Sequence, residues 1–322
     1  MRYRTFGRTG LQVSELGYGA WGIGKSLWQG AEDGESLRAL RRAVELGVNF
    51  IDTALAYGDG HSERLVGQVV RETETTVYVA TKVPPLNGQW PARDDVPVEE
   101  VFPGSWIERC TERSLEHLGL DTVDVQQLHV WSDEWVGQGD WLETIERLKA
   151  GGKIRFFGVS INDHQPANAL RLIETGVVDT VQVIYNVFDQ SPEDELFQAV
   201  EEANVGVIVR VPFDEGGLTG NVRPDSTFPP GDFRNEYFAG DRKEEVWRRV
   251  QAILAELDVP LERLPEIALR FCISAPAVST VIAGMRSTRN VEANAAAVDA
   301  GPLSADELAV LQRHRWVHGF YG

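Results

Sequence analysis

Short apolar runs alternate with amphipathic segments along almost the whole of this 322-residue chain, and this alternation constrains the fold more than any other feature. Between the runs, apolar residues recur at helical spacing. Strands that alternate with helices build a parallel sheet. The runs of strand length, most of them rich in β-branched residues, are 15–20, 48–52, 77–82, 123–129, 154–160, 181–185, 205–211 and 278–284.

Two architectures fit this alternation: a closed (β/α)8 barrel and an open, doubly wound sheet. The open sheet is usually marked by G-x-G-x-x-G at the start of a helix that follows the first strand. Residues 17–22 have those letters, but loop-like residues follow them. Because no shift in composition divides the chain, we expect a single domain, 1–322, with a (β/α)8 TIM-barrel fold. We also expect an N-terminal β-hairpin over about 2–13 and extra C-terminal helices, one of them at 304–314.

The composition limits the possible partners. A formal net charge of −18 should repel nucleic acids and anionic membrane surfaces. No apolar run approaches the roughly 18–20 residues of a membrane span, and no secretory signal is visible, so a cytoplasmic location is expected. Cys110 and Cys272 have neither metal nor redox spacing, which predicts reduced core thiols and no metal site.

Polar residues stand at the ends of three successive strands. Asp52, Lys82 and His129 close the second, third and fourth, and such positions meet at one rim of a barrel. Tyr57 follows Asp52 by five residues. A neighbouring ammonium should lower the pKa of the phenol and make Tyr57 a general acid near neutrality. The set could protonate a carbonyl, while the hydride must come from a cofactor.

These residues carry a family resemblance. Residues 50–67, with Asp52 and Tyr57, resemble the signature of the aldo-keto reductases, and the strands around Lys82 and His129 are similar to the family's lysine and histidine strands. The resemblance implies reduction of a small-molecule aldehyde or ketone. Tyr57 would be the acid, Lys82 and Asp52 its tuning pair, and His129 the group that orients the carbonyl.

The resemblance also implies a nicotinamide dinucleotide, with NADPH favoured over NADH because Arg286 could pair with a 2′-phosphate. However, Asn290 stands where several NADPH-specific members carry arginine. Residues 216–220 resemble the loop that contacts the pyrophosphate. The cofactor residues implied in this way are Ser160, Asn162, Gln182, Arg210, Pro212, Gly217, Leu218, Gly284, Arg286, Asn290 and Asn294.

Two positions depart from the family pattern. Ile161 separates Ser160 from Asn162, whereas the family often has the serine and asparagine adjacent. Arg210 stands where many members have an aromatic ring that stacks on nicotinamide. A guanidinium can stack, and beside a ring that is cationic when oxidised it should favour the reduced form. Alternatively, Arg210 is a structural cation paired with Asp214 or Glu215.

The long segments 84–103 and 212–240 follow strands and are expected at the C-terminal face, where barrel active sites lie. Trp21 and Trp90 are candidates for the substrate pocket, with simple packing as the alternative for Trp21. The aromatic tail 315–322 could reach the same face. Two other functions remain open: a cofactor-sensing regulatory subunit, and a glycosidase, which would need paired carboxylates where only Asp52 is clearly placed.

Overall fold

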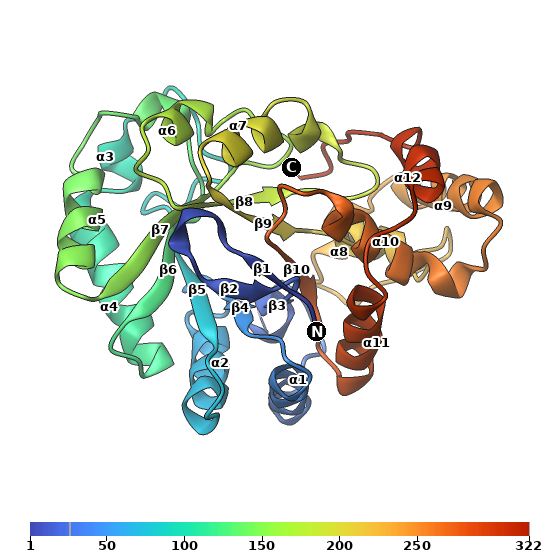
Figure 1. Ribbon diagram of the computed structural model, residues 1–322, viewed down its shortest axis with the longest axis horizontal. Coiled ribbons are helices and arrows are strands. Elements are labelled where there is room, and N and C mark those ends of the chain that lie inside the picture. The colour runs from blue at the N-terminus through green and yellow to red at the C-terminus, as the bar shows by residue number, and fades with distance from the viewer. Residues whose placement is uncertain (26, 322) are drawn as a thin grey trace.

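The computed structural model describes residues 1–25 and 27–321 of the chain. Eight parallel strands close into a barrel, as predicted, and each strand pairs with its neighbours in chain order until β10 meets β3. Figure 1 shows the helices as an outer layer around these strands. The barrel strands are β3 (Leu16–Gly19), β4 (Phe50–Asp52), β5 (Tyr78–Val83), β6 (Val123–Leu128), β7 (Ile154–Ser160), β8 (Thr180–Ile184), β9 (Gly206–Arg210) and β10 (Thr280–Gly284).

The predicted N-terminal hairpin is present and closes one end of the barrel. Its strands, β1 (Tyr3–Thr5) and β2 (Gln12–Ser14), are antiparallel and joined through the 3-10 turn η1 (Gly7–Thr9). Phe6, Leu11 and Val13 pack against inward-facing strand residues in a small buried cluster. Gly206 is required where the hairpin packs on the barrel, because a Cβ there would lie 2.4 Å from the Phe6 ring. Since Gly206 is the first residue of β9, the carboxyl ends of the barrel strands lie at the opposite end.

Helices occupy the connections, because their amphipathic faces cover the outside of the strands. The predicted C-terminal helix is confirmed: Ser304 caps α12 in a capping box with Glu307. The helices are α1 (Asp33–Glu45), α2 (His61–Glu72), α3 (Val98–Val101), α4 (Gly104–Leu118), α5 (Trp141–Ala150), α6 (Leu170–Glu174), α7 (Leu196–Glu202), α8 (Arg234–Tyr237), α9 (Arg242–Leu257), α10 (Leu264–Ser274), α11 (Thr288–Asp299) and α12 (Ala305–Gln312).

Both long segments lie between a barrel strand and the next long helix. Segment 84–103 contains α3 and a cis peptide bond between Trp90 and Pro91, and segment 212–240 contains the 3-10 turn η5 (Asp214–Thr219) and α8. The other 3-10 turns are η2 (Trp21–Ile23), η3 (Asp133–Trp135), η4 (Ser191–Glu193) and η6 (Leu261–Arg263).

The C-terminal tail returns from α12 to the face that carries the strand ends, as expected. The backbone N–H of Trp316 donates to the carbonyl of Phe188 (2.7 Å), and the Tyr321 hydroxyl donates to Glu215 (2.6 Å). Gly322 lies outside the described residues. Within the described part of the chain, no helix is long and apolar enough to cross a membrane.

Candidate active site

The four residues predicted from the strand ends meet at one point of the barrel, and Lys82 is at its centre. Its ammonium donates to a carboxylate oxygen of Asp52, to the carbonyl of Thr53 (2.8 Å) and to the hydroxyl of Tyr57 (3.2 Å). Lys82 is fully buried and Asp52 almost so. A buried charge is tolerated only with such partners, so this contact set explains a lysine inside an apolar strand.

The loop that carries Tyr57 is held by the start of α2. The backbone N–H of Ser62 donates to the carbonyl of Tyr57 (3.2 Å), and the Ser62 hydroxyl donates to the carbonyl of Ala20 (2.9 Å). Gly58 is needed because its φ is +67° and its backbone passes against Gly24, where a Cβ would lie 1.9 Å from the carbonyl oxygen. The phenol therefore has a fixed position over the ammonium.

The pKa of Tyr57 is shifted in the direction opposite to the expectation. Burial raises the pKa of Tyr57 above its usual value of 10, and the charge of Lys82 only partly offsets this. Burial lowers the pKa of Lys82, but the charges of Asp52 and Tyr57 outweigh it, so the net pKa is raised. Near neutral pH, Tyr57 thus holds its proton and Lys82 its charge. This is the protonation that a proton donor and its electrostatic partner require.

His129 lies beside this pair, just past β6. Burial lowers its pKa well below 6.5, and the charges of Lys82 and Arg210 lower it further, so the imidazole is neutral. Its ring is 5.7 Å from that of Tyr57 and 4.4 Å from that of Trp90, between centroids. Trp21, the other predicted pocket residue, has its ring 6.5 Å from Tyr57 on another side. Both tryptophans thus flank the phenol and the imidazole.

Asp52 is anchored from the far side by two glutamines. Gln182 and Gln127 both donate to its second carboxylate oxygen, at 2.8 and 3.1 Å. Gln182 was predicted as a cofactor residue, and this bond leaves only part of its amide for a ligand. Gln127 was not predicted. It could have been, because residues two apart on a strand share a face and Gln127 precedes His129 by two.

The predicted carboxamide ligands are only partly together. Ser160 and Gln182 are paired across β7 and β8, at the end where Tyr57 lies. Asn162 faces the 84–103 segment: its amide donates to the carbonyl of Ala92 (3.0 Å) and its oxygen accepts from the N–H of Ala92 (3.1 Å). In this structure Asn162 holds that segment in place.

Arg210 ends β9 and points into the same space. Its guanidinium donates to Asp163 and to the carbonyl of Ile161 (3.0 Å), while its Nε is buried and has no hydrogen-bond partner within residues 1–25 and 27–321. The alternative pairing with Asp214 or Glu215 is wrong, because Asp163 holds this position. The charge of Arg210 acts against the larger effect of burial on the pKa of Tyr57, and it adds to the lowering of the pKa of His129 by burial.

The segment after Arg210 turns sharply. Val211, Asp214 and Glu215 have φ of +56°, +49° and +51°, a conformation that costs a β-branched residue most. Pro212 and Leu218 are buried, and a Cβ on Gly217 would lie 2.7 Å from Asp214. Most of the segment 216–220, which was predicted to contact the pyrophosphate, therefore lies in η5 (Asp214–Thr219).

Two contacts join the tail to η5. His318 lies 3.1 Å from Asp214 through its Nε2, and Tyr321 donates to Glu215. Burial lowers the pKa of His318, but Asp214 outweighs this and the net pKa is raised. Burial raises the pKa of Glu215 to about 7.

The predicted adenosine residues lie apart from the Tyr57 group, after β10. Gly284 and Asn290 are exposed, Asn294 is buried in α11, and Arg286 is half-buried against Gly22. The guanidinium of Arg286 donates to the carbonyl of Gln29 (2.7 Å). These residues thus form a separate group, which Arg286 joins to the loop that follows β3.

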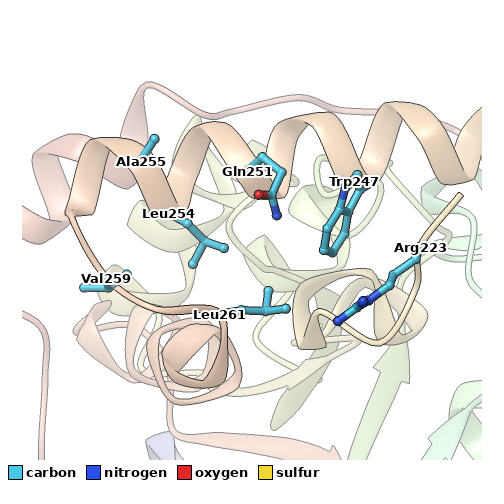
Figure 2. Close-up of a pocket in the computed structure, with 7 residues that line it drawn as sticks. All are labelled: Arg223, Trp247, Gln251, Leu254, Ala255, Val259 and Leu261. Carbon is cyan, nitrogen blue, oxygen red and sulfur yellow. The ribbon is translucent and has the colours of Figure 1, made fainter.

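A separate groove of about 480 Å³ lies beside α9. Figure 2 shows Trp247, Gln251 and Leu254 of α9 lining it, with Arg223 opposite. None of its lining residues belongs to the group around Tyr57 or to the group around Arg286.

Comparison with known proteins identifies this arrangement. A family model described as "Aldo/keto reductase family" matches residues 15–315. "Aldo-keto reductase YhdN" of Bacillus subtilis (strain 168) is 29% identical over 91% of this chain and 87% of that protein. "NADH-specific methylglyoxal reductase" of Escherichia coli (strain K12) is 27% identical over 95% and 96%. A "probable voltage-gated potassium channel subunit beta" of Oryza sativa subsp. japonica is 30% identical over 96% and 94%.

Solved structures of aldo-keto reductases have the same fold as this chain. The holo form of aldo-keto reductase AKR11C1 from Bacillus halodurans superposes with a TM-score of 0.76, at 28% identity, over all of both chains. An aldo/keto reductase from Klebsiella pneumoniae in complex with NADP and acetate has a TM-score of 0.68, at 25% identity, over 97% of this chain and 94% of that one. With a family model that spans most of the sequence and a barrel of the same architecture, this chain belongs to the aldo/keto reductase family of oxidoreductases.

Proposed function

We propose that this chain, acting as one domain over residues 1–322, reduces an aldehyde or ketone to an alcohol with NADPH, and that Tyr57 donates the proton. One observation carries the proposal: the Tyr57 hydroxyl lies 3.2 Å from the buried ammonium of Lys82, which is itself bonded to Asp52. The phenolate that forms when the proton leaves would be stabilised by that ammonium. The neutral imidazole of His129 can donate a hydrogen bond to the carbonyl oxygen.

The residues around this point fit a nicotinamide dinucleotide, which supplies the hydride when bound. Ser160, at the end of β7, lies beside Gln182 of β8, and the buried Nε of Arg210 has no hydrogen-bond partner among the described residues. We propose that these groups, with Pro212, hold the nicotinamide end. Asn162 would bind there only if it released Ala92.

The other end of the cofactor would lie over η5 and β10. We propose that Gly217 and Leu218 contact the pyrophosphate and that Gly284, Arg286, Asn290 and Asn294 hold the adenosine. The guanidinium of Arg286 supports NADPH over NADH, since it can pair with a phosphate that NADH lacks. Arg210 keeps a positive charge at the nicotinamide end, which favours binding of NADPH over NADP⁺.

The test is NADPH oxidation followed against a panel of aldehydes and ketones, with wild type and Tyr57→Phe. The variant should lose at least about 10²-fold in kcat, the usual contribution of a positioned general acid. The matched control is Tyr185→Phe, which removes another phenol hydroxyl, one bonded to Glu193. Undiminished turnover by Tyr57→Phe would remove Tyr57 from the role.

A second candidate function is a regulatory subunit that binds the cofactor with little turnover. The relative named as a probable potassium channel subunit beta favours it. The same experiment separates the two: NADPH binding without turnover of any carbonyl in the panel supports the regulatory reading, whereas turnover that depends on Tyr57 supports the reductase.

A further inference from the structure

The indole of Trp28, in the loop between β3 and α1, contacts two guanidinium groups from distant parts of the chain. The Cζ of Arg234, at the start of α8, lies 4.3 Å from the ring centroid, and that of Arg286, after β10, lies 5.3 Å from it. The loop is tied to α8 by the N–H of Phe233, which donates to the carbonyl of Leu27 (2.9 Å). Three segments therefore meet around one ring.

The charges in this cluster are not balanced. Arg234 donates two hydrogen bonds of 2.8 Å to Asp232, whose side chain is fully buried. For Arg286, no carboxylate of the described residues lies within 4.0 Å. Burial lowers the pKa of Arg286 and the charge of Arg234 lowers it further, against a smaller opposing effect of Asp232. A half-buried cation that has no carboxylate of the described residues within ion-pair distance can bind an anion.

We propose that Arg234 and Arg286 together bind one phosphate group, and that Trp28 moves aside when this phosphate binds. The ligand is a phosphate monoester on the ribose of the dinucleotide, so this inference rests on the proposed function. Such a group carries close to two negative charges at neutral pH, and Arg286 balances only one. Arg234 directs its Nε and Nη2 to Asp232, and Arg286 donates from Nη1 to Gln29, so the remaining N–H groups of the two guanidinium groups would approach the phosphate oxygens.

Trp28 has a defined part in this site. An indole face attracts cations, and the Trp28 ring lies against the guanidinium groups of both Arg234 and Arg286. The donors of one phosphate must approach it within hydrogen-bond distance. For both guanidinium groups to do so, the ring that touches both has to leave. Asp232 keeps Arg234 in place meanwhile.

The experiment is calorimetric titration of the full chain with 2′,5′-ADP and with 5′-ADP. Neither nucleotide has a nicotinamide, so binding is read without turnover. Wild type should bind 2′,5′-ADP more tightly. Arg234→Gln should weaken 2′,5′-ADP roughly tenfold or more, the effect of one charge-assisted contact, and leave 5′-ADP within about twofold. A double variant, Asp232→Asn with Arg234→Gln, should change the two affinities as Arg234→Gln does. It also removes the buried carboxylate charge that Arg234→Gln alone would leave without its partner.

Arg223→Gln is the matched control. Arg223 comes from the same 212–240 segment and also lies over an indole, that of Trp247 at 5.3 Å, as Figure 2 shows. Its removal should leave both affinities unchanged. Tryptophan fluorescence should change when 2′,5′-ADP binds, and Trp28→Phe should abolish most of that change. A fluorescence response that Trp28→Phe leaves intact would contradict the movement of this ring.

Wild-type affinity for 2′,5′-ADP in folded Arg234→Gln would overturn the proposal. Inorganic phosphate should compete far more weakly than 2′,5′-ADP, and equally tight competition would overturn the nucleotide assignment. Failure of the proposed function would give a different result. The wild-type protein would then bind 2′,5′-ADP and 5′-ADP equally well, which would mean that it has no preference for a phosphate on the ribose.

Discussion

Asp52→Asn tests the electrostatics of the site most sharply, because it changes charge with almost no change of shape. One oxygen of Asp52 accepts from Lys82, and the other accepts from Gln127 and Gln182. An asparagine must direct its NH₂ group toward one of these donors. Lys82 then loses the charge that outweighs its burial, so its pKa falls from the raised value that it has in the wild type.

The size of the effect follows from one distance. A full charge on the Tyr57 oxygen, 3.2 Å from the ammonium, is stabilised by about 5 kcal/mol at an effective dielectric constant of about 20. A transition state with about half that charge would gain about 2–3 kcal/mol, and its loss is roughly 10²-fold in kcat. Breaking a buried ion pair should also cost about 3–5 kcal/mol of folding stability.

The assay is kcat against pH, with urea unfolding of the same samples. In wild type, Lys82 stays charged through the neutral range because its pKa is raised. In Asp52→Asn, activity should persist at low pH and decline as pH rises through the lowered pKa of Lys82. Gln127→Glu is a useful companion, since it adds a carboxylate near Lys82 instead of removing one. An Asp52→Asn protein with the pH profile and kcat of the wild type would refute this role of the charge on Lys82.

Three further predictions concern other parts of the chain. Arg286→Ala should raise KM for NADPH about tenfold or more and KM for NADH little; equal effects in steady-state kinetics would contradict the phosphate contact. Gly60→Ala should lower Tm far more than Gly137→Ala: both have φ of +78°, but only at Gly60 would the new Cβ lie 1.9 Å from His117. Glu215→Gln should flatten the pH dependence of unfolding free energy. Because the folded pKa of Glu215 is about 7 against an ordinary 4.5, wild type loses up to about 3 kcal/mol as pH rises through that range. Parallel curves for the two proteins would contradict this.

The positions of the strands were predictable because their signal is local. Each barrel strand lies within the predicted run or differs from it by a few residues at its ends, as β4 (Phe50–Asp52) does against 48–52. Apolar residues on both faces of a short β-branched run need only a few neighbours to be recognised. The N-cap of α12 at Ser304 is likewise a property of four consecutive residues.

The meeting of Asp52, Tyr57, Lys82 and His129 was predictable for a topological reason. In a closed parallel barrel all strands point the same way, so residues that end neighbouring strands share one rim. The direction of the pKa shift of Tyr57 was predicted wrongly, because burial and the ammonium act in opposite directions and only their balance decides the sign.

By itself, the sequence determined the barrel, its hairpin plug and the four polar residues at its rim. These follow from the periodicity of the chain and from the order of its strands. Only the tertiary structure decided that Arg210 pairs with Asp163, that Asn162 holds Ala92, and that Trp28 joins Arg234 to Arg286. Each of these contacts joins parts of the chain that lie far apart in sequence, and most involve loops at the strand ends. No local period relates such loops, so their partners are settled only when the closed barrel brings the loops to one face.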